Sequence, residues 1–198
     1  MSDYHVIHQQ DFQKVPWKNG QGFTYEIDKL SEPSDPEAFL WRLSIAEVKQ
    51  SGDFSFFNGY QRNISILSGG GMYLNVDGIQ SPELSAFQSF QFAGEAQTYC
   101  TLTGPELRDF NVIYRDPFQV SVDWMTPSPQ PLTIAPHTTC FIISGRQTSH
   151  VRTRQHIYHL SEWELLKITP SSVPEKLQFI ECNHASVVGI IMIRRRVS

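Results

Sequence analysis

The chain is dominated by short runs in which apolar and polar residues alternate. One run extends from Phe39 to Ala46, a second from Met72 to Val76 and a third from Asp109 to Arg115. A period of two residues is typical of strands whose two faces differ. Twelve Gly and twelve Pro residues punctuate the sequence, and many short strands with turns between them indicate a β-sandwich or a β-barrel. We therefore predict an all-β protein.

Two β-rich modules are expected along the chain. Prolines at alternate positions between residues 125 and 131 interrupt any strand there and indicate a connector within or between modules. We predict an N-terminal module over residues 1–117, which carries the ligand pocket, and a C-terminal module over residues 118–198. If the modules exchange strands, they form one compact unit. A short helical turn is expected from Ser161 to Lys167, where a Ser side chain can cap it.

Charge and composition exclude several classes of protein. With 40% hydrophobic and 18% charged residues, the chain is neither a disordered tail nor a coiled coil. A net charge of −4, with one basic run at Arg194–Arg196, argues against nucleic-acid binding. Without a long apolar stretch or a signal-peptide pattern, we expect a cytoplasmic protein that binds no membrane. Cys100, Cys140 and Cys182 are far apart and are expected to be free thiols.

A metal site is the first chemistry to test, because small β-barrels often hold one. The single-metal cupin pattern fixes the spacing between two glycines and the ligands, and Gly52 and Gly71 fit the two glycine positions. The ligand positions then fall on Asn58, Tyr60 and Ile64. None of these offers the imidazole, thiolate or carboxylate that a transition metal prefers. The spacing favours a cupin fold, while the residues predict no metal and no other cofactor.

Three polar residues occupy positions where the strand pattern predicts an inward-facing apolar side chain. Arg62 is in phase with the apolar residues that follow it, and Asp109 and Asn111 are in phase with Leu107 and Ile113. A buried guanidinium or carboxylate must be paired or must bind something. One interpretation is a structural pair of Arg62 and Asp109, and the other is a pocket for a carboxylate, which matches the planar fork of Arg. Both hold if Asp109 orients Arg62.

The segment from Pro16 to Ile27 combines a turn with an alternating strand. A Trp-Lys-Asn-Gly sequence leads into a run in which Thr24 and Glu26 share one face. Gly20 and Gly22 allow a positive φ angle or a close approach of the backbone to a ligand. Composition alone leaves two interpretations open, an ordinary turn with surface charges and a binding site.

Several segments resemble, in the same order, those of the HutD/Ves family of cupin-like proteins. The segments run from Val15 to Ile27, Trp41 to Ala46, Gly52 to Arg62, Phe90 to Glu95 and Asp109 to Val112. The resemblance covers roughly residues 4–115. Two motifs depart from the family pattern, because Gln21 interrupts the glycine-rich turn and Phe57-Asn58-Gly59 stands in place of a Phe-Pro-Gly turn.

The resemblance implies an RmlC-like cupin fold of two modules, a bicupin, built as a barrel or sandwich and holding no metal. It also implies a link to histidine utilisation, where HutD is thought to limit the output of the pathway by sensing an intermediate such as urocanate or N-formylglutamate. Ves relatives are described as stress-related, and the sequence does not choose between the two branches. We therefore expect a regulator or sensor that binds a small carboxylate.

The expected ligand site combines cations, hydrogen-bonding groups and aromatic walls. The predicted ligand-binding residues are Lys18, Asn19, Thr24, Glu26, Arg62, Asp109 and Asn111. Trp17 and Trp41 would form apolar walls. No nucleophile–base pair stands out, so no catalytic residue is expected. Two alternatives stay open: a metal-independent isomerase or hydrolase with Glu26 or Asp109 as acid–base group, and a plain interaction module. An exposed edge strand would allow a homodimer.

Overall fold

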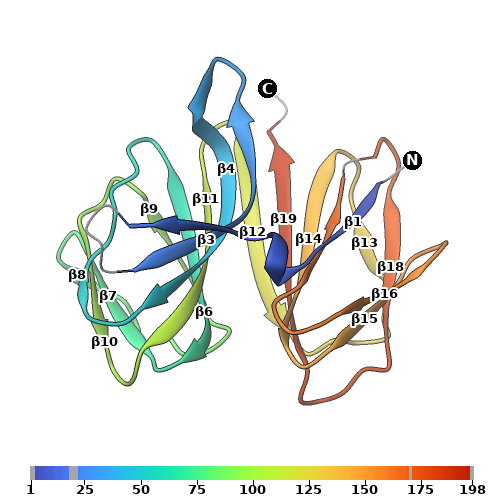
Figure 1. Cartoon of the computed structure of the whole chain (residues 1–198). Coiled ribbons are helices and arrows are strands. Elements are labelled where there is room, and N and C mark those ends of the chain that lie inside the picture. The colour runs from blue at the N-terminus through green and yellow to red at the C-terminus, as the bar shows by residue number, and fades with distance from the viewer. Residues whose placement is uncertain (1–2, 18–21, 170, 197–198) are drawn as a thin grey trace. The chain divides into compact units, whose positions relative to one another are not determined.

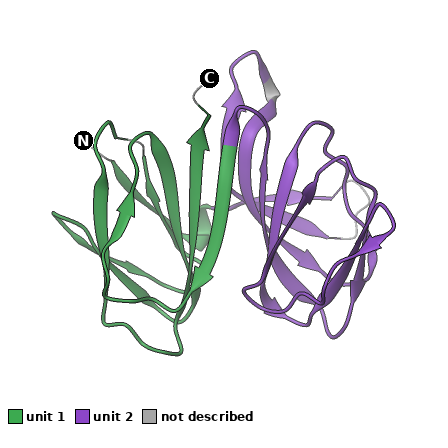
Figure 2. Cartoon of the chain, turned by 180° about the vertical axis from the view of Figure 1, so that it is seen from behind, with its two compact units in different colours: residues 1–11, 119–198 green, residues 12–118 purple. Residues whose placement is uncertain are grey.

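The computed structural model describes residues 3–17, 22–169 and 171–196, and within them the chain is built almost entirely of strands (Figure 1). Two compact units form, one from residues 12–118 and one from residues 1–11 together with 119–198 (Figure 2). The predicted N-terminal module included residues 1–11. The structure instead pairs β1 (Tyr4–Ile7) with β17 (Leu165–Ile168), which places the first strand with the C-terminal half.

The unit of residues 12–118 is a sandwich of two sheets. Its six-stranded sheet has the order β2 (Gln13–Pro16), β3 (Phe23–Glu32), β4 (Asp35–Val48), β11 (Leu107–Tyr114), β6 (Gln61–Gly69) and β9 (Ser89–Ala93). Its four-stranded sheet has the order β5 (Gly52–Asp53), β10 (Thr98–Leu102), β7 (Met72–Val76) and β8 (Ile79–Gln80). The two sheets stay open and do not close into a barrel.

The other unit repeats this two-sheet plan. Its five-stranded sheet has the order β1, β17, β14 (Thr138–Arg146), β19 (Val187–Arg195) and β12 (Phe118–Met125). Its four-stranded sheet has the order β13 (Leu132–Ile134), β18 (Glu175–Ile180), β15 (Ser149–Arg152) and β16 (Ile157–Leu160). A short 3-10 helix, η1 (Gln9–Asp11), follows β1. The proline-rich residues 126–131 connect β12 to β13 inside this unit.

The predicted helical turn from Ser161 to Lys167 is wrong. Residues 165–168 form β17, which pairs with β1 on one side and β14 on the other. Trp163 has a φ angle of 63°, a left-handed conformation that a helix does not accept. Leu165, Leu166 and Ile168 are buried, so tertiary packing decides the local structure. In the part of the chain that the structure describes, no helix is long and apolar enough to cross a membrane.

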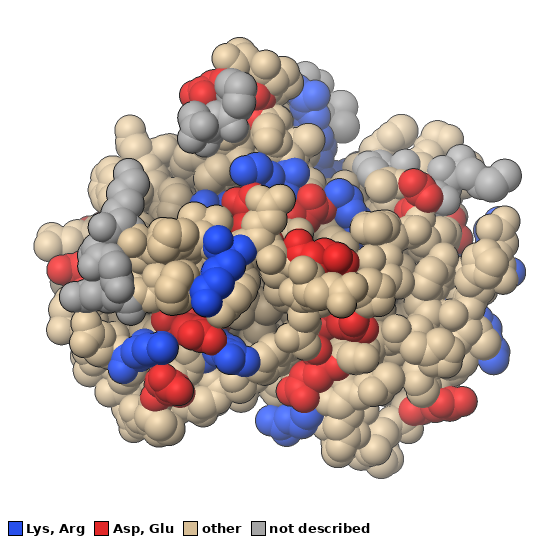
Figure 3. Space-filling model, in the orientation of Figure 1, with Lys and Arg blue, Asp and Glu red and all other residues tan. Residues whose placement is uncertain are grey.

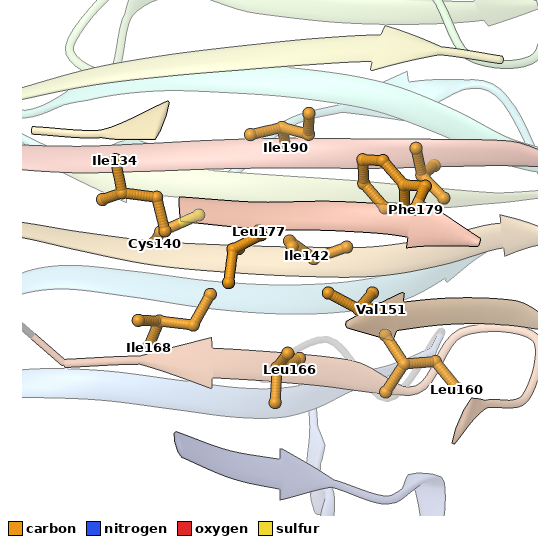
Figure 4. Packing of buried hydrophobic residues seen from close by; sticks show 11 residues of the cluster. Ile134, Cys140, Ile142, Val151, Leu160, Leu166, Ile168, Leu177, Phe179 and Ile190 are labelled. Atoms are coloured by element: carbon orange, nitrogen blue, oxygen red, sulfur yellow. The ribbon is translucent and has the colours of Figure 1, made fainter. Parts of the chain in front are cut away.

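Each unit has an apolar core between its sheets. In the unit completed by β1, side chains such as Ile142, Leu166 and Leu177 point toward one another (Figure 4). In the unit of residues 12–118, Ile64 and Ile66 of β6 belong to a corresponding cluster that contacts both sheets. This second cluster occupies only part of the interior of the 12–118 unit. Elsewhere on β6 and β11 the buried residues are polar, among them Arg62, Asp109 and Asn111.

Candidate functional site

A cavity of about 660 Å³ lies beside the apolar cluster of the 12–118 unit. Its size is within the range of small-molecule sites, which are roughly 300–1,000 Å³. The lining residues are Val15, Pro16, Trp17, Thr24, Glu26, Arg42, Ser44, Ala46, Val48, Asp53, Phe54, Ser55, Phe56, Phe57, Arg62, Asp109, Asn111 and Ile113. The wall formed by β3, β4, β6 and β11 is rich in polar groups, whereas the segment after β5 contributes aromatic rings.

Strand register explains why these polar residues share one cavity. Asn111 of β11 is opposite Ser44 of β4, and Ser44 is in turn opposite Glu26 of β3. In the next row, Asp109 is opposite Ala46, which is opposite Thr24. Cross-strand partners point to the same side of a sheet, so side chains that are distant in sequence meet there.

A hydrogen-bonded chain of three side chains forms the deepest polar part of the cavity. Arg62 Nη2 donates to Asn111 Oδ1 at 2.7 Å, and Asn111 Nδ2 donates to Asp109 Oδ1 at 2.5 Å. Arg62 Nη1 also donates to the carbonyl oxygen of Ser55 at 3.3 Å, while its buried Nε has no partner. Arg62 and Asp109 form no direct ion pair within the described residues, because Asn111 lies between them. The predicted structural pair is therefore replaced by an amide bridge.

Burial controls the charges in this part of the cavity. Arg62 is 6% exposed and Asp109 is 2% exposed. Burial lowers the pKa of Arg62 to about 10, although the charge of Asp109 opposes this shift. Burial raises the pKa of Asp109 to about 7, despite Arg62 and hydrogen bonds from the Ala46 backbone and Asn111. At neutral pH Arg62 keeps its positive charge while Asp109 is only partly ionised, so Asp109 neutralises Arg62 only in part.

Aromatic rings surround the Arg62 guanidinium. Its Cζ lies 5.0 Å from the ring centroid of Phe54, 5.5 Å from that of Phe57 and 5.1 Å from that of Phe92. Such contacts stabilise a desolvated cation and leave the edge of the guanidinium available for hydrogen bonds. The rings thus help to hold a buried positive charge that has no direct carboxylate partner.

Trp17 and Thr24 form another part of the cavity wall. Trp17 Nε1 donates to Thr24 Oγ1 at 2.9 Å, and the Trp17 backbone nitrogen donates to the carbonyl oxygen of Gly22. A Cβ atom at Gly22 would lie 3.1 Å from the Trp17 ring, so the absence of a side chain permits this packing. The backbone at Gly22 therefore makes its close approach to the indole ring of Trp17.

The structure brings five of the predicted ligand-binding residues together. Thr24, Glu26, Arg62, Asp109 and Asn111 all line the cavity. The strand phase predicted that the last three face inward, and all three are buried. The other two predicted positions, 18 and 19, lie outside the described residues.

Trp41 does not line the cavity and is a wrong prediction for its wall. It lies on the opposite face of β4 from Arg42 and Ser44, and it is buried there. Arg42 and Ser44 were not predicted for the site, because they alternate with the more apolar residues of this run. Asp53 was also missed, because its two-residue strand carries no periodic signal.

The three positions that the cupin spacing assigned to metal ligands do not form a ligand set. Asn58 is exposed, Tyr60 donates its hydroxyl proton to the carbonyl oxygen of Phe39 at 2.7 Å, and Ile64 lies in the apolar cluster. Among the described residues, no group of three or more His, Cys, Asp or Glu side chains is placed to hold a metal ion.

The surface of the described residues carries charges of both signs (Figure 3). On the face drawn in Figure 3, basic and acidic side chains of the described residues are interspersed rather than gathered by sign. Inside the cavity, Arg42 and Arg62 share the wall with the carboxyl groups of Glu26, Asp53 and Asp109.

Comparison with known proteins places this arrangement in a family. A family model described as HutD matches residues 9–185. The chain belongs to the HutD family. It is 50% identical over 114 residues to a Pseudomonas putida protein described as an uncharacterized 21.2 kDa protein in the hutC 3' region. It is 37% identical over 109 residues to protein Ves from Citrobacter koseri.

These curated relatives are matched over part of their length. The alignments cover 58% and 53% of this chain, and 60% and 56% of the P. putida and C. koseri proteins. The chain therefore spans less than two thirds of the length of the curated relatives it matches. The family assignment rests on the family model, which matches residues 9–185.

Solved structures match nearly the whole chain. HutD from Pseudomonas fluorescens SBW25 is 30% identical with a TM-score of 0.83, and a conserved protein of unknown function from Pseudomonas aeruginosa PAO1 is 30% identical with a TM-score of 0.87. Each alignment covers 98% of this chain and 100% of the other. Protein YlbA from E. coli, at 8% identity and a TM-score of 0.71, and the E. coli pirin YhhW, at 10% and 0.65, share the fold alone. The predicted all-β cupin fold is confirmed, with open sheets.

Proposed function

We propose that this HutD family protein binds a small carboxylate-bearing metabolite in the cavity of residues 12–118 and acts as a regulator or sensor of histidine utilisation. The observation that carries the proposal is the buried Arg62, whose Nε lacks a partner and whose fork borders a cavity of about 660 Å³. A carboxylate accepts two parallel hydrogen bonds from such a fork. It also supplies the negative charge that Asp109 supplies only in part at neutral pH.

The surrounding groups suit a ligand with a polar remainder. Asn111, Ser44 and Thr24 offer donors and acceptors along the polar wall, while Phe54 and Phe57 offer apolar surface. Urocanate presents one carboxylate and an imidazole, whereas N-formylglutamate presents two carboxylates and an amide. Both have the chemistry that this wall can recognise.

Two features support sensing rather than turnover in the histidine pathway. The HutD family name and the hutC-region description of the P. putida relative connect the family to that pathway. Within the described residues, the cavity lining contains no imidazole and no thiol, the groups that most often act as a base or nucleophile. Binding without conversion is the property that a sensor needs.

Titration calorimetry tests this proposal with urocanate, N-formylglutamate and formate, the smallest carboxylate. We expect one of the two intermediates to bind, and Arg62→Ala to weaken binding about tenfold to a hundredfold, because a hydrogen bond to a charged group contributes about 1.5–3 kcal/mol. Arg108→Ala is the matched control, since Arg108 lies on the other face of β11 and pairs with Glu47 at 2.9 Å. Absence of binding at millimolar concentration, or an Arg62→Ala variant that binds like wild type, contradicts the proposal.

One observation favours a second function, a metal-independent isomerase or hydrolase. Asp109 lines the cavity with its pKa raised to about 7 by burial, which suits a group that exchanges a proton near neutral pH. Incubation with each intermediate, followed by NMR, would reveal turnover. Turnover that disappears in Asp109→Asn would establish the enzyme, whereas unchanged compounds in the presence of binding would favour the sensor.

A further inference from the structure

Asp109 lies at the far end of the hydrogen-bonded chain that starts at Arg62. Asn111 accepts from Arg62 Nη2 at 2.7 Å and donates from its own Nδ2 to Asp109 Oδ1. Asp109 is 2% exposed, and the backbone N–H of Ala46 also donates to its carboxyl group. A carboxyl group buried in this way ionises only as far as the cation at the other end of the chain and the hydrogen bonds compensate for its desolvation.

A carboxylate bound at the Arg62 fork would weaken that compensation. It brings a second negative charge to the guanidinium on which Asp109 depends, and it displaces water from the cavity that both residues line. Both changes disfavour the charged form of Asp109, the first through repulsion between like charges and the second through desolvation. Since a single amide joins Asp109 to the fork, the effect of a ligand reaches Asp109 directly.

The other titratable groups around the cavity are less able to change their protonation. Among the described residues, the groups that line the cavity with Asp109, or whose titration its charge affects, are Arg62 on β6, Arg42 on β4, Glu26 on β3, Asp53 on β5 and Cys100 on β10. The two guanidiniums are already protonated. Burial raises the pKa of the Cys100 thiol to about 12, so the thiol is protonated as well. Glu26 contacts Lys29 Nζ at 3.0 Å, and Asp53 is exposed to solvent.

We propose that binding of an anionic ligand at Arg62 is coupled to the uptake of one proton by Asp109, so that the protein binds its ligand more tightly at mildly acidic than at alkaline pH. The inference rests on the function proposed above, which requires a carboxylate at Arg62, and it adds a means of regulation to that site. The proton comes from the solvent and converts the carboxylate of Asp109 into a neutral carboxyl group. The protein would then respond to the metabolite and to acidity together.

The direction of the pH dependence follows from the free protein. Burial raises the pKa of Asp109 to about 7, and a bound anion raises it further. Well below pH 7, Asp109 is protonated with and without the ligand, so the affinity does not depend on this group. As the pH rises through 7, the free protein loses the proton and must regain it on binding. The affinity therefore falls as the pH rises.

Calorimetry in buffers of different ionisation enthalpy counts the protons taken up on binding. Urocanate and N-formylglutamate are each titrated at pH 7.5 into the wild type and into Asp109→Asn. The wild type should take up about half a proton or more per bound ligand, and Asp109→Asn should take up none. Asp53→Asn removes an exposed carboxyl group of the same cavity and should keep the wild-type uptake. Equal proton uptake by the wild type and Asp109→Asn would overturn the coupling.

The affinity of the wild type between pH 7 and 8.5 gives a second measurement. In this range the carboxylates of both compounds stay ionised and the imidazole of urocanate is largely neutral. The dissociation constant should rise about fourfold to tenfold over the range, while that of Asp109→Asn stays nearly constant. Because the wild-type profile needs no variant, it decides the question when Asp109→Asn does not fold or bind. A ligand that binds with the same affinity at both ends of the range contradicts the coupling and leaves the carboxylate sensor intact. If neither compound binds at any pH, the proposed function fails and the coupling fails with it.

Discussion

The two units build their interiors around similar pairs of antiparallel strands, yet they fill them with different chemistry. In the unit completed by β1, β14 and β19 place Ile142 opposite Ile190, in the middle of an apolar cluster. In the unit of residues 12–118, β6 and β11 place Ile64 opposite Asn111 and Arg62 opposite Ile113. One strand pair thus contributes to an apolar cluster, and the corresponding pair carries polar residues that line a cavity.

This difference shows what a buried polar residue requires. Asn111 is 4% exposed but accepts from Arg62 and donates to Asp109, so both ends of its amide are satisfied. Remaining donors and acceptors line a cavity that a ligand can enter. The cluster around Ile142 and Ile190 in the other unit is made of apolar side chains, so the same residue type would be costly there.

The largest expected effect comes from placing an amide in the apolar cluster of the unit completed by β1. Ile190→Asn removes a buried aliphatic side chain and buries polar atoms opposite Ile142, where no described hydrogen-bond partner is available. We expect a loss of about 3–5 kcal/mol in the free energy of unfolding, measured by urea denaturation. Ile190→Val is the control, with an expected loss of about 1 kcal/mol. If the two variants lose the same stability, the two interiors do not differ as described.

The strand pattern predicted an all-β protein and the inward-facing polar residues of the 12–118 unit, whereas the cupin fold was expected from the glycine spacing and the family resemblance. Period-two alternation identified β-strands, and the phase of Arg62 and Asp109 predicted inward-facing polar groups, because both lie in runs whose other inward residues are apolar. That signal is strong wherever one face of a strand is clearly more apolar than the other. It needs no knowledge of which strands pair.

Other parts of the site depend on pairing, which the sequence does not display. β4 has a strongly apolar face, which includes Trp41, and a cavity face, which includes Arg42 and Ser44. The alternation does not tell which of the two faces a cavity. Only register shows that Arg42 and Arg62 flank Ile113. The same limitation explains the wrong helix at residues 161–167, where pairing with β1 and β14 overrides a local capping signal.

The buried carboxyl of Asp109 makes the stability of the 12–118 unit depend on pH. The pKa of Asp109 rises from 3.8 to about 7 on folding because burial disfavours its charge. The folded protein therefore holds this proton more tightly than the unfolded chain does. Ionising Asp109 in the folded state therefore lowers the free energy of unfolding. This loss is absent below about pH 4, grows as the pH rises and is complete above about pH 7, where it reaches up to about 4 kcal/mol.

Asp109→Asn removes this titration, because an amide resembles the protonated carboxyl at every pH. Urea denaturation between pH 4 and 8 should show the wild type losing stability relative to Asp109→Asn as the pH rises. Asp123→Asn, at an exposed position on β12 of the other unit, is the control and should parallel the wild type. Parallel curves for all three proteins would mean that Asp109 is not held in a raised-pKa environment.

The smallest expected effect is that of metal removal. The polar groups that distinguish the cavity are guanidinium, amide and carboxyl, and the cupin ligand positions hold Asn58, Tyr60 and Ile64. A bound metal would stabilise the folded state by mass action, so its removal would lower the melting temperature. We expect EDTA to leave the melting temperature unchanged and elemental analysis to find no stoichiometric transition metal. About one metal ion per chain, lost on chelation together with several degrees of stability, would show that the polar interior serves a metal and would overturn the interpretation of the cavity as an organic-anion site.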